Sequence, residues 1–517
     1  MTTPTYGLVF NRESYDPRPA QASDLSVVGI VLPSEDADAT VFPLNEPVAF
    51  DSGDPAVISK LGTGELAQAI LSIDDQLADF QTSARVVAVR VTKGVNDAAT
   101  MTNIIGSRTA TTSAGNVGTG LYALLRAGAQ LGVIPRLICA PGYTWQTTAG
   151  SPTLTKAANV GNTGNGTMSN PTSQTGAMVG LYKVDFTSAT AFTVTDPMAN
   201  VVGTGTAGTA FSTQVGFTVT AGATAFVAGN GFTITVNGIV QANPVVAALP
   251  SICSALLGHA VVGGPGGGLT AGANWAETIT SERIIAVDTW RKVNDGAGGT
   301  RLEDGVAAAI GLGVRVDFKH GGLPFWSFSG EQVHGTIGLK NYYPFSLTDG
   351  ATTGQEMLAA HIGVIERGEI GVETAIGSNG FIFAGVWNAS TDPIWWFYNK
   401  TRGRDWAHLA LLKSIRLRLG MTNVTPHGVQ AVLNDMVAIG QKLINNQCSV
   451  GFRVGFEANR NSPDDLRQGK FTVYFATEEP APIVNVTIDS RPNYEALVAE
   501  LGTLVAQAAS LPAQYIQ

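Results

Sequence analysis

The residues that could carry out chemistry are spread along the chain and form no recognisable site. No two of the six histidines have the HxH or HxxxH spacing that lets neighbouring imidazoles share one zinc ion. They are His259, His320, His334, His361, His408 and His427. The sequence also lacks the GxSxG turn that exposes a nucleophilic serine and the GxxxxGK[ST] loop that holds a phosphate. We therefore expect no enzyme activity, no metal site and no cofactor.

The composition favours a folded protein that hides surface against partners. Of its 517 residues, 44% are hydrophobic and 14% are charged, well below the ~25% charged residues of a typical soluble domain. A net charge of −9 argues against direct nucleic-acid binding through a basic surface. No apolar run reaches the roughly 18 residues that span a bilayer, and residues 1–19 lack the pattern of a secretory signal. We expect cytoplasmic synthesis without a signal peptide and no stable membrane insertion.

Alternating strands and helices point to an α/β domain that is interrupted. Residues 25–32 and 85–91 are continuous apolar runs typical of buried strands, and residues 66–80 between them have the apolar spacing of a helix. A helix at 120–131 and a strand at 136–140 follow, and the pattern resumes at 283–287. We assign residues 25–143 and 281–390 to one discontinuous α/β domain.

The intervening residues 144–280 differ in composition. Between positions 141 and 250 the only charged residues are Lys156, Lys183, Asp185 and Asp196. Short β-prone runs separated by glycine and asparagine turns predict an inserted, mainly-β outer domain, either a sandwich or a barrel. Disorder is the competing interpretation, and frequent valine and phenylalanine argue against it. The glycine-rich residues 263–268 are expected to close the insertion as a linker.

Residues 391–490 predict a C-terminal α/β domain. Expected are a strand at 394–398, a helix at 404–419, a second helix to about 445, strands at 448–456 and 469–476, and an alternating strand at 483–488. Thr425 followed by Pro426 has the pattern of a helix N-terminus. Residues 1–24 are expected to be an arm, and residues 491–517 a helix with a tail. The predicted fold class is multidomain, mixed α+β and α/β, with extended terminal arms.

The helix predicted at 404–419 gathers positive charge in an otherwise acidic chain. Its basic residues are Arg402, Arg404, Lys413, Arg416 and Arg418. Lys413 and Arg416 are three positions apart and can share one helical face. Two interpretations stay open, a solvated face or a basic ridge that docks on an acidic partner, where charge steers association and sets register.

The C-terminal third resembles that of phage tail sheath proteins. The similarity rests on Phe452-Arg453-Val454, Asn459, Asn461, Asp464-Asp465, residues 469–473 and Pro480-Ala481. In the N-terminal half, Tyr6-Gly7, residues 27–31, residues 43–47 and residues 135–142 are similar as well, so the resemblance covers about residues 5–142 and 282–490. Two features depart from the family, because Pro482 stands where a glutamate is usual and a helix follows the last strand.

The resemblance implies a structural, non-enzymatic subunit of a contractile tail sheath in the virion tail. Such a subunit forms a helical homo-oligomer of stacked rings around the tail tube protein, meets baseplate and tail terminator proteins, and contracts to drive the tube through the host envelope. Its terminal arms add strands to neighbouring subunits, and its basic helix would face the tail tube. The implied linkage residues are Tyr6, Leu8, Val9 and Phe10 in the arm and Val473, Phe475, Val484, Val486 and Ile488 in the C-terminal strands.

The three cysteines, Cys139, Cys253 and Cys448, form no CxxC pair. In a particle released outside the cell an odd number of thiols permits an intersubunit disulfide, whereas free buried thiols are the common alternative. Two other functions stay open. A surface-layer or capsid-type shell protein would share the low charge, and a cytoplasmic α/β enzyme would share the alternation of strands and helices.

Overall fold

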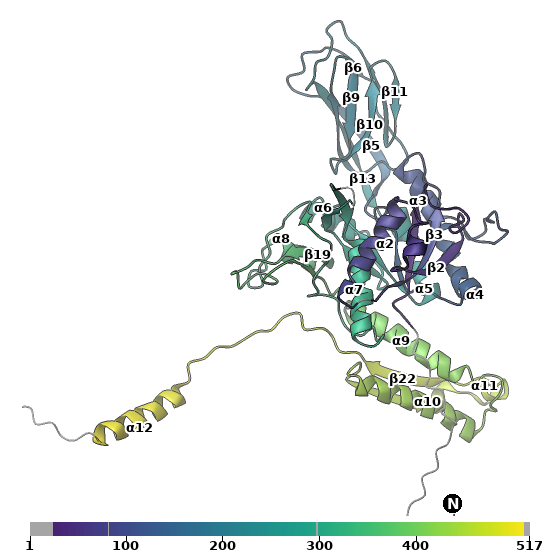
Figure 1. Ribbon diagram of the computed structural model, residues 1–517, viewed down its shortest axis with the longest axis vertical. Coiled ribbons are helices and arrows are strands. Elements are labelled where there is room, and N and C mark those ends of the chain that lie inside the picture. Colours follow the sequence, from purple (N-terminus) through teal and green to yellow (C-terminus); the bar gives the residue numbers. More distant parts are fainter. Residues whose placement is uncertain (1–23, 81, 296–297, 511–517) are drawn as a thin grey trace, which may run out of the picture. The chain divides into compact units, whose positions relative to one another are not determined.

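The computed structural model describes residues 24–80, 82–295 and 298–510. The chain divides into two compact units, Met1–Ala481 and Pro482–Gln517. The first unit contains an α/β core, a β-sandwich and a C-terminal helical domain with a hairpin, and the second contains one helix (Figure 1).

An eight-stranded sheet forms the centre of the first unit, in the order β2-β3-β1-β4-β14-β15-β19-β20. The six central strands are parallel to their neighbours, and the edge strands β2 and β20 are antiparallel. The strands are β1 (Val28–Pro33), β2 (Pro47–Asp51), β3 (Arg85–Val91), β4 (Leu137–Cys139), β14 (His259–Gly263), β15 (Ile284–Val287), β19 (Ile362–Arg367) and β20 (Phe381–Ala384).

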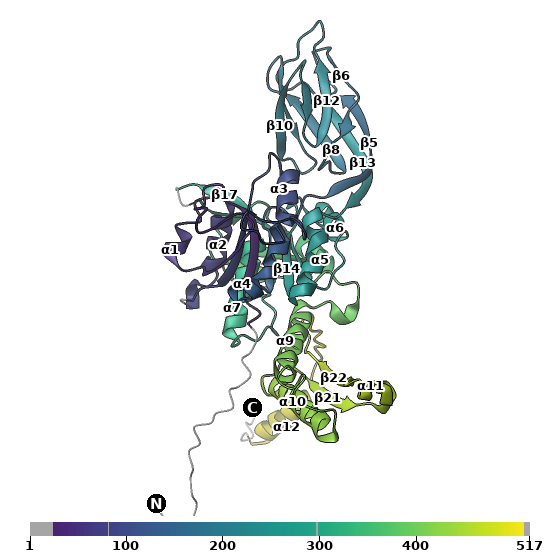
Figure 2. The same cartoon turned by 90° about the vertical axis from the view of Figure 1, so that its right-hand side faces the viewer.

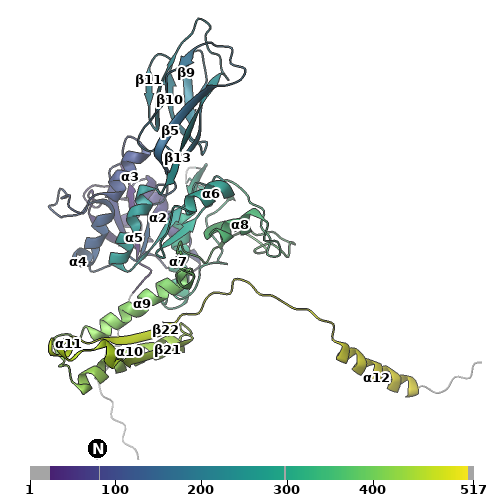
Figure 3. The same cartoon turned by 180° about the vertical axis from the view of Figure 1, so that it is seen from behind.

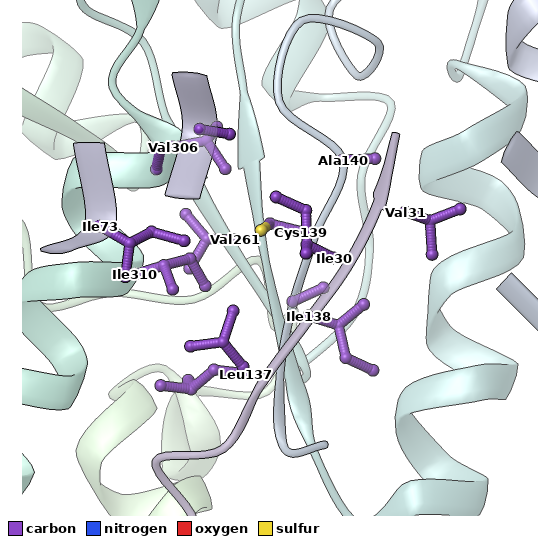
Figure 4. Close-up of a cluster of buried hydrophobic side chains, with 14 of the residues drawn as sticks. Ile30, Val31, Ile73, Leu137, Ile138, Cys139, Ala140, Val261, Val306 and Ile310 are labelled. Carbon is purple, nitrogen blue, oxygen red and sulfur yellow. The ribbon is translucent and has the colours of Figure 1, made fainter. Parts of the chain in front are cut away.

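Helices cover both faces of this sheet, which explains why its strands are continuous apolar runs without alternation. Ile73 and Ile310 lie on one side of the strands, and Val31 points to the other (Figure 4). The helices of the core are α1 (Pro55–Ile58), α2 (Glu65–Asp75), α3 (Asp97–Ile105), α4 (Ala127–Leu131), α5 (Pro244–Leu256), α6 (Leu269–Ala276), α7 (Val306–Lys319) and α8 (Thr353–Ala359). A small sheet beside them joins β16 (Trp290–Asn294), β17 (Thr300–Asp304) and β18 (Gly338–Leu339).

The inserted sandwich has its own hydrophobic core. A five-stranded sheet, β10-β9-β8-β13-β5, faces a smaller sheet built on β12, and six phenylalanines fill the space between them, with Phe186 stacked on Phe226 at 4.1 Å. The strands are β5 (Thr148–Ala158), β6 (Thr167–Met168), β7 (Thr172–Ser173), β8 (Gly180–Phe186), β9 (Ala191–Thr195), β10 (Val201–Thr206), β11 (Ala210–Ser212), β12 (Val215–Thr220) and β13 (Gly231–Gln241).

The sequence-based boundary of the insertion is wrong at its C-terminal side. Residues 244–276 form α5, β14 and α6, and β14 pairs with β4 and β15 in the middle of the central sheet. Asn243 caps α5 by accepting hydrogen bonds from the backbone N–H groups of Val245 and Val246. The low charge that suggested an outer β-domain here has another cause, because a core helix and strand buried among other elements also lack charged residues.

The C-terminal domain of the first unit packs two helices against a hairpin (Figure 2). Its elements are α9 (Tyr398–Ile415), α10 (Pro426–Asn445), β21 (Gly451–Phe456), α11 (Pro463–Arg467) and β22 (Val473–Glu478). Thr425 caps α10 as predicted, since its side chain accepts a hydrogen bond from the Gly428 N–H.

Three predicted elements differ from the structure. Residues 394–398 form no strand, because Asp392 caps a 3₁₀ turn at Pro393–Trp395 and α9 begins at Tyr398. Residues 120–131 divide into a 3₁₀ helix, Gly120–Arg126, followed by α4. In the second unit, residues 483–488 form no strand, since a lone extended segment has no backbone partner; the helix of this unit is α12 (Tyr494–Ser510).

Candidate assembly interface

The hairpin β21–β22 is a sheet with only two strands. The strands pair from Gly451 opposite Glu478 to Phe456 opposite Val473, and among the described residues nothing pairs with their outer edges. One face of the hairpin lies on α10 (Figure 3). There the Phe452 ring packs so closely on Gly440 that a β-carbon at position 440 would lie 2.4 Å from it.

Helix α10 covers the apolar face of this hairpin only in part. The side chains that share the face of Phe452 are Val454, Phe456, Val473 and Phe475, and none of the five is buried. Phe456 is 38% exposed. A two-stranded ribbon over one helix is marginally stable alone, and a third strand usually completes it.

Helix α10 has an apolar surface wider than the hairpin. Its residues Val432, Met436 and Leu443 are buried, whereas Val437 and Ile444 are 45% and 37% exposed. Helical geometry places Val437 and Ile444 beyond Gly440, on the side of the helix that β21 covers only in part. This part of α10 and the outer edge of β21 therefore form one open, apolar strip, which we call the β21 strip.

Most of the predicted basic ridge is used inside the chain. Arg402 pairs with Asp317 at 2.5 Å, and both side chains are almost fully buried. Arg404 binds both carboxylate oxygens of Glu479 at 2.7 Å, and Arg418, which lies beyond the end of α9, binds Asp435 at 2.6 Å. Both interpretations of these residues, a solvated face or a basic ridge that docks on a partner, required exposed side chains, whereas the first turns of α9 are buried against the core.

Two members of the basic group lie at the end of α9. Arg416 is exposed, and Lys413 is partly buried, with its pKa lowered by desolvation and by the positive charge of Arg416. Exposed Leu412, Leu417 and Leu419 surround them. The surface is thus mixed, basic and apolar together.

A buried polar cluster joins α9 to the α/β core. Arg283 reaches Asp405 at 2.5 and 3.2 Å, and the His259 Nε2 lies 3.1 Å from the Thr401 hydroxyl. Burial and the neighbouring guanidinium groups of Arg283 and Arg402 hold the pKa of His259 well below its usual value. With the Arg402–Asp317 pair, this cluster fixes α9 on the core through directed contacts rather than through apolar packing alone.

All three cysteines are buried and free. Burial raises the pKa of Cys253 and of Cys448 to about 12, and the pKa of Cys139 is raised further in the same direction. A thiol with no exposed surface cannot meet a thiol of another subunit unless the fold opens. The structure therefore argues against the predicted intersubunit disulfide.

Three buried carboxylates were not predicted as notable from the sequence. Asp288 accepts a hydrogen bond from the Gly266 N–H, and burial raises its pKa to about 7. Burial likewise raises the pKa of Glu366 to about 8 and that of Asp304 to about 6. The sequence pattern that could have pointed to Asp288 and Glu366 is an acidic residue at the end of an apolar run. One oxygen each of Asp288 and Glu366 lacks a hydrogen-bond partner.

A cavity of about 700 Å³ lies near the carboxyl ends of the central strands. Leu32, Tyr143 and Asp304 line it from the core, and Asn200 and Gln214 line it from the sandwich.

Within residues 24–80, 82–295 and 298–510 no three histidine, cysteine or acidic side chains are placed to hold a metal ion. No helix in the described part of the chain is long and apolar enough to cross a membrane.

The predicted linkage residues divide into three groups. Val473 and Phe475 lie on the face of the hairpin that packs on α10, and both are half-buried. Val484, Val486 and Ile488 are exposed in the second unit and belong to no strand. Tyr6, Leu8, Val9 and Phe10 lie outside the described residues.

The first unit thus contains a largely parallel α/β core, an inserted sandwich and a two-stranded C-terminal hairpin whose outer edges have no strand partner among the described residues. No protein-family model matches the chain. The chain is 39% identical over 130 residues to the major tail sheath protein of Serratia phage KSP20, covering 24% of this chain and 30% of that protein. It is 40% identical over 124 residues to the tail sheath protein of Escherichia phage P2, covering 23% and 29%. The chain thus spans less than a third of the length of these two curated relatives.

Solved structures of sheath assemblies share the fold. The contracted helical sheath of the anti-feeding prophage matches with a TM-score of 0.54 at 10% identity, covering 95% of this chain and 100% of that chain. The contracted sheath complex of an extracellular contractile injection system matches with a TM-score of 0.53 at 10% identity, covering 96% and 100%. The curated relatives confirm the predicted resemblance to tail sheath proteins, and the solved structures show that the fold is shared.

Proposed function

We propose that this protein is a non-enzymatic, structural subunit of a contractile tail sheath in a virion tail. It polymerises helically around a tail tube and contracts to drive the tube through the host envelope. The observation that carries the proposal is the hairpin β21–β22, whose apolar face is only partly covered and whose outer edge has no strand partner among the described residues. A shell protein of the surface-layer or capsid type is not favoured, because the curated relatives are tail sheath proteins.

The β21 strip is the proposed site of subunit linkage. Strand β22 continues into Glu478 and Glu479, which bind Lys400 and Arg404 of α9, so its side of the hairpin is already engaged. The outer edge of β21 has no strand partner among the described residues, and Val437 and Ile444 of α10 are exposed. A strand from another subunit would satisfy the backbone groups of that edge and bury the apolar strip at the same time.

Two segments of the chain have the pattern that such a strand requires. Val484, Val486 and Ile488 alternate with the polar Asn485 and Thr487, and Ile488 is 82% exposed, so one face can pack on α10 while the other faces solvent. In the N-terminal arm Tyr6, Leu8 and Phe10 are also two positions apart. Each arm would link its own subunit to a neighbour.

The end of α9 is the proposed contact with the tail tube. Lys413 and Arg416 supply positive charge, and the exposed leucines around them supply apolar area. Charge would guide the docking of an acidic tube surface, and apolar contact would hold it. Baseplate and tail terminator proteins are proposed as partners at the two ends of the polymer.

Contraction needs subunits that move without separating. The buried cluster around Arg402 and Asp405 fixes the C-terminal domain to the core, whereas residues 482–493, which would lead to a neighbour, contain no helix or strand. Subunits would therefore rotate as rigid bodies while exchanged strands keep them joined. The extended lattice would be a long-lived state that converts to a contracted lattice of lower free energy.

The test is electron microscopy of the purified full chain carrying Ile444→Asp. The substitution places a carboxylate beneath the added strand, and we expect it to abolish tubes while the free subunit stays folded. Asn445→Asp is the matched control, since the next residue adds the same charge on another side of α10. Deletion of residues 1–20 is expected to abolish tubes as well. Normal tubes from Ile444→Asp would contradict linkage at the β21 strip, and discrete monomers from the unmodified chain would contradict the sheath function.

A further inference from the structure

Helix α12 carries a continuous apolar stripe that is fully exposed. Asn493 caps the helix by accepting a hydrogen bond from the Ala496 N–H. None of its residues is buried, and its six large apolar side chains are between 50% and 74% exposed. They are Tyr494, Leu497, Val498, Leu501, Leu504 and Val505. A helix of this length with a glycine in its middle is marginal in water without a partner.

The spacing of this stripe is that of a helix that pairs with other helices. Tyr494, Leu497, Leu501 and Leu504 follow one another at alternating steps of three and four residues, and Ala508 continues the series. This is the a/d repeat of a coiled coil, and Val498 and Val505 widen the seam on one side. An apolar groove or a flat sheet would not require such a repeat.

The charges of α12 fit a second copy of itself. Glu495 and Glu500 are its only charged residues. In the heptad frame they occupy the b and g positions, so neither lies in the a/d seam and identical parallel helices meet without opposing like charges. The side away from the stripe carries small, uncharged residues such as Ala499, Thr503 and Ala506 rather than the charged face of a solvated helix. A bundle of several copies can therefore pack around α12.

We propose that α12 is an intersubunit clamp in which α12 helices from different copies of this chain associate through the Tyr494–Leu504 seam. The reach of the tether permits this. Residues 482–493 contain no helix or strand, and twelve extended residues span at most about 40 Å, so helices anchored on neighbouring subunits can meet. The clamp depends on the proposed function in one respect. The polymer would hold the α12 helices at a high local concentration, which favours weak helix pairing.

The buried native cysteines make a direct test available. In the full chain an introduced Leu501→Cys supplies a thiol in the seam, and Ala499→Cys supplies one on the opposite side of the same helix. Cys139, Cys253 and Cys448 are buried and do not compete. With a short bifunctional maleimide we expect subunit crosslinking to be about 100-fold faster for Leu501→Cys than for Ala499→Cys, the gain that a raised effective concentration gives.

Three results would overturn the clamp: equal, slow crosslinking of both variants, protection of the position-501 thiol in isolated monomers, or crosslinking of that thiol to a tail tube protein. A Leu497→Glu, Leu504→Glu double substitution should remove the crosslink from Leu501→Cys while leaving the rest of the chain folded. Microscopy of the same samples separates the two proposals. Tubes without crosslinks would contradict the clamp alone, and crosslinks without tubes would contradict the sheath function alone.

Discussion

The inserted sandwich and the C-terminal hairpin are both β-structures with an apolar face, yet only the sandwich is complete. Its two sheets cover each other, and Tyr182, Phe186 and Phe192 are all buried. The hairpin has one helix beneath two strands, and its apolar residues stay half-exposed. A β-segment whose apolar face is buried within the subunit is complete alone. A β-segment whose apolar face is only partly buried is a candidate site for an added strand.

The largest difference in the loss of unfolding free energy should appear when one phenylalanine is replaced in the sandwich and one in the hairpin. Phe186→Ala leaves a cavity in a closed core and should cost about 3–5 kcal/mol of unfolding free energy. Phe456→Ala should cost about 1 kcal/mol or less in the free subunit, because Phe456 is already partly in water. Calorimetry of both variants measures the contrast. Equal losses of stability would show that the hairpin core is closed in the free subunit.

Ion pairs that bind α9 should differ according to burial. Arg402→Met leaves the buried Asp317 carboxylate without its partner and should cost about 3–5 kcal/mol. Arg418→Met removes a partly exposed pair with Asp435 and should cost about 1 kcal/mol or less. Denaturant unfolding checks both. The double variant Arg402→Met, Asp317→Leu should recover most of the stability, and failure to recover would indicate a role beyond charge pairing.

Stability should depend on pH through the α/β core rather than through the hairpin. Burial raises the pKa of Asp288 to about 7 and that of Glu366 to about 8. The folded state therefore holds these protons to higher pH than the unfolded state, so stability is full near pH 4 and falls as the pH rises to about 8. At pH 8, Asp288→Asn should remove a loss of unfolding free energy on the order of a few kcal/mol. The difference between the melting temperatures at pH 5 and pH 8.5 should shrink in this variant, with the part due to Glu366 remaining, and an unchanged difference would contradict the assignment.

The smallest expected effect concerns the thiols. Cys139, Cys253 and Cys448 should react with a maleimide only when the protein is denatured, because each side chain has no exposed surface. Mass spectrometry after labelling of the native protein measures this. Rapid labelling at Cys448, which lies next to the hairpin, would show that the C-terminal domain opens readily in the free subunit.

Local sequence patterns predicted elements that are recognisable from an apolar run or a helix cap. The apolar run at 85–91 is β3 with the same bounds, and the Thr425-Pro426 pair marks the first turn of α10. The start of α9 could not be predicted in this way. Its first turns carry Lys400, Arg402 and Asp405, and their partners lie far away in sequence or on the core, so only the tertiary fold explains why these charges are buried.

The candidate site was predicted only in part for the same reason. Val473 and Phe475 were implied by the resemblance to tail sheath proteins, and they lie in β22 of the hairpin. The apolar flank of α10 at Val437 and Ile444 was missed, because an exposed valine on a helix has no meaning until the width of the sheet above it is known. The pattern of a single strand or helix shows which face is apolar, and only the packed structure shows how much of that face is covered.

The way the sandwich is attached to the core has an engineering consequence. Strands β5 and β13 lie side by side where the chain enters and leaves the insertion, and Thr148 is paired directly with Gln241. The chain therefore enters and leaves the sandwich at two adjacent positions. Any cargo domain whose termini are equally close could replace the sandwich, so this subunit offers a ready-made mounting point for displaying a foreign domain at every repeat of a polymer.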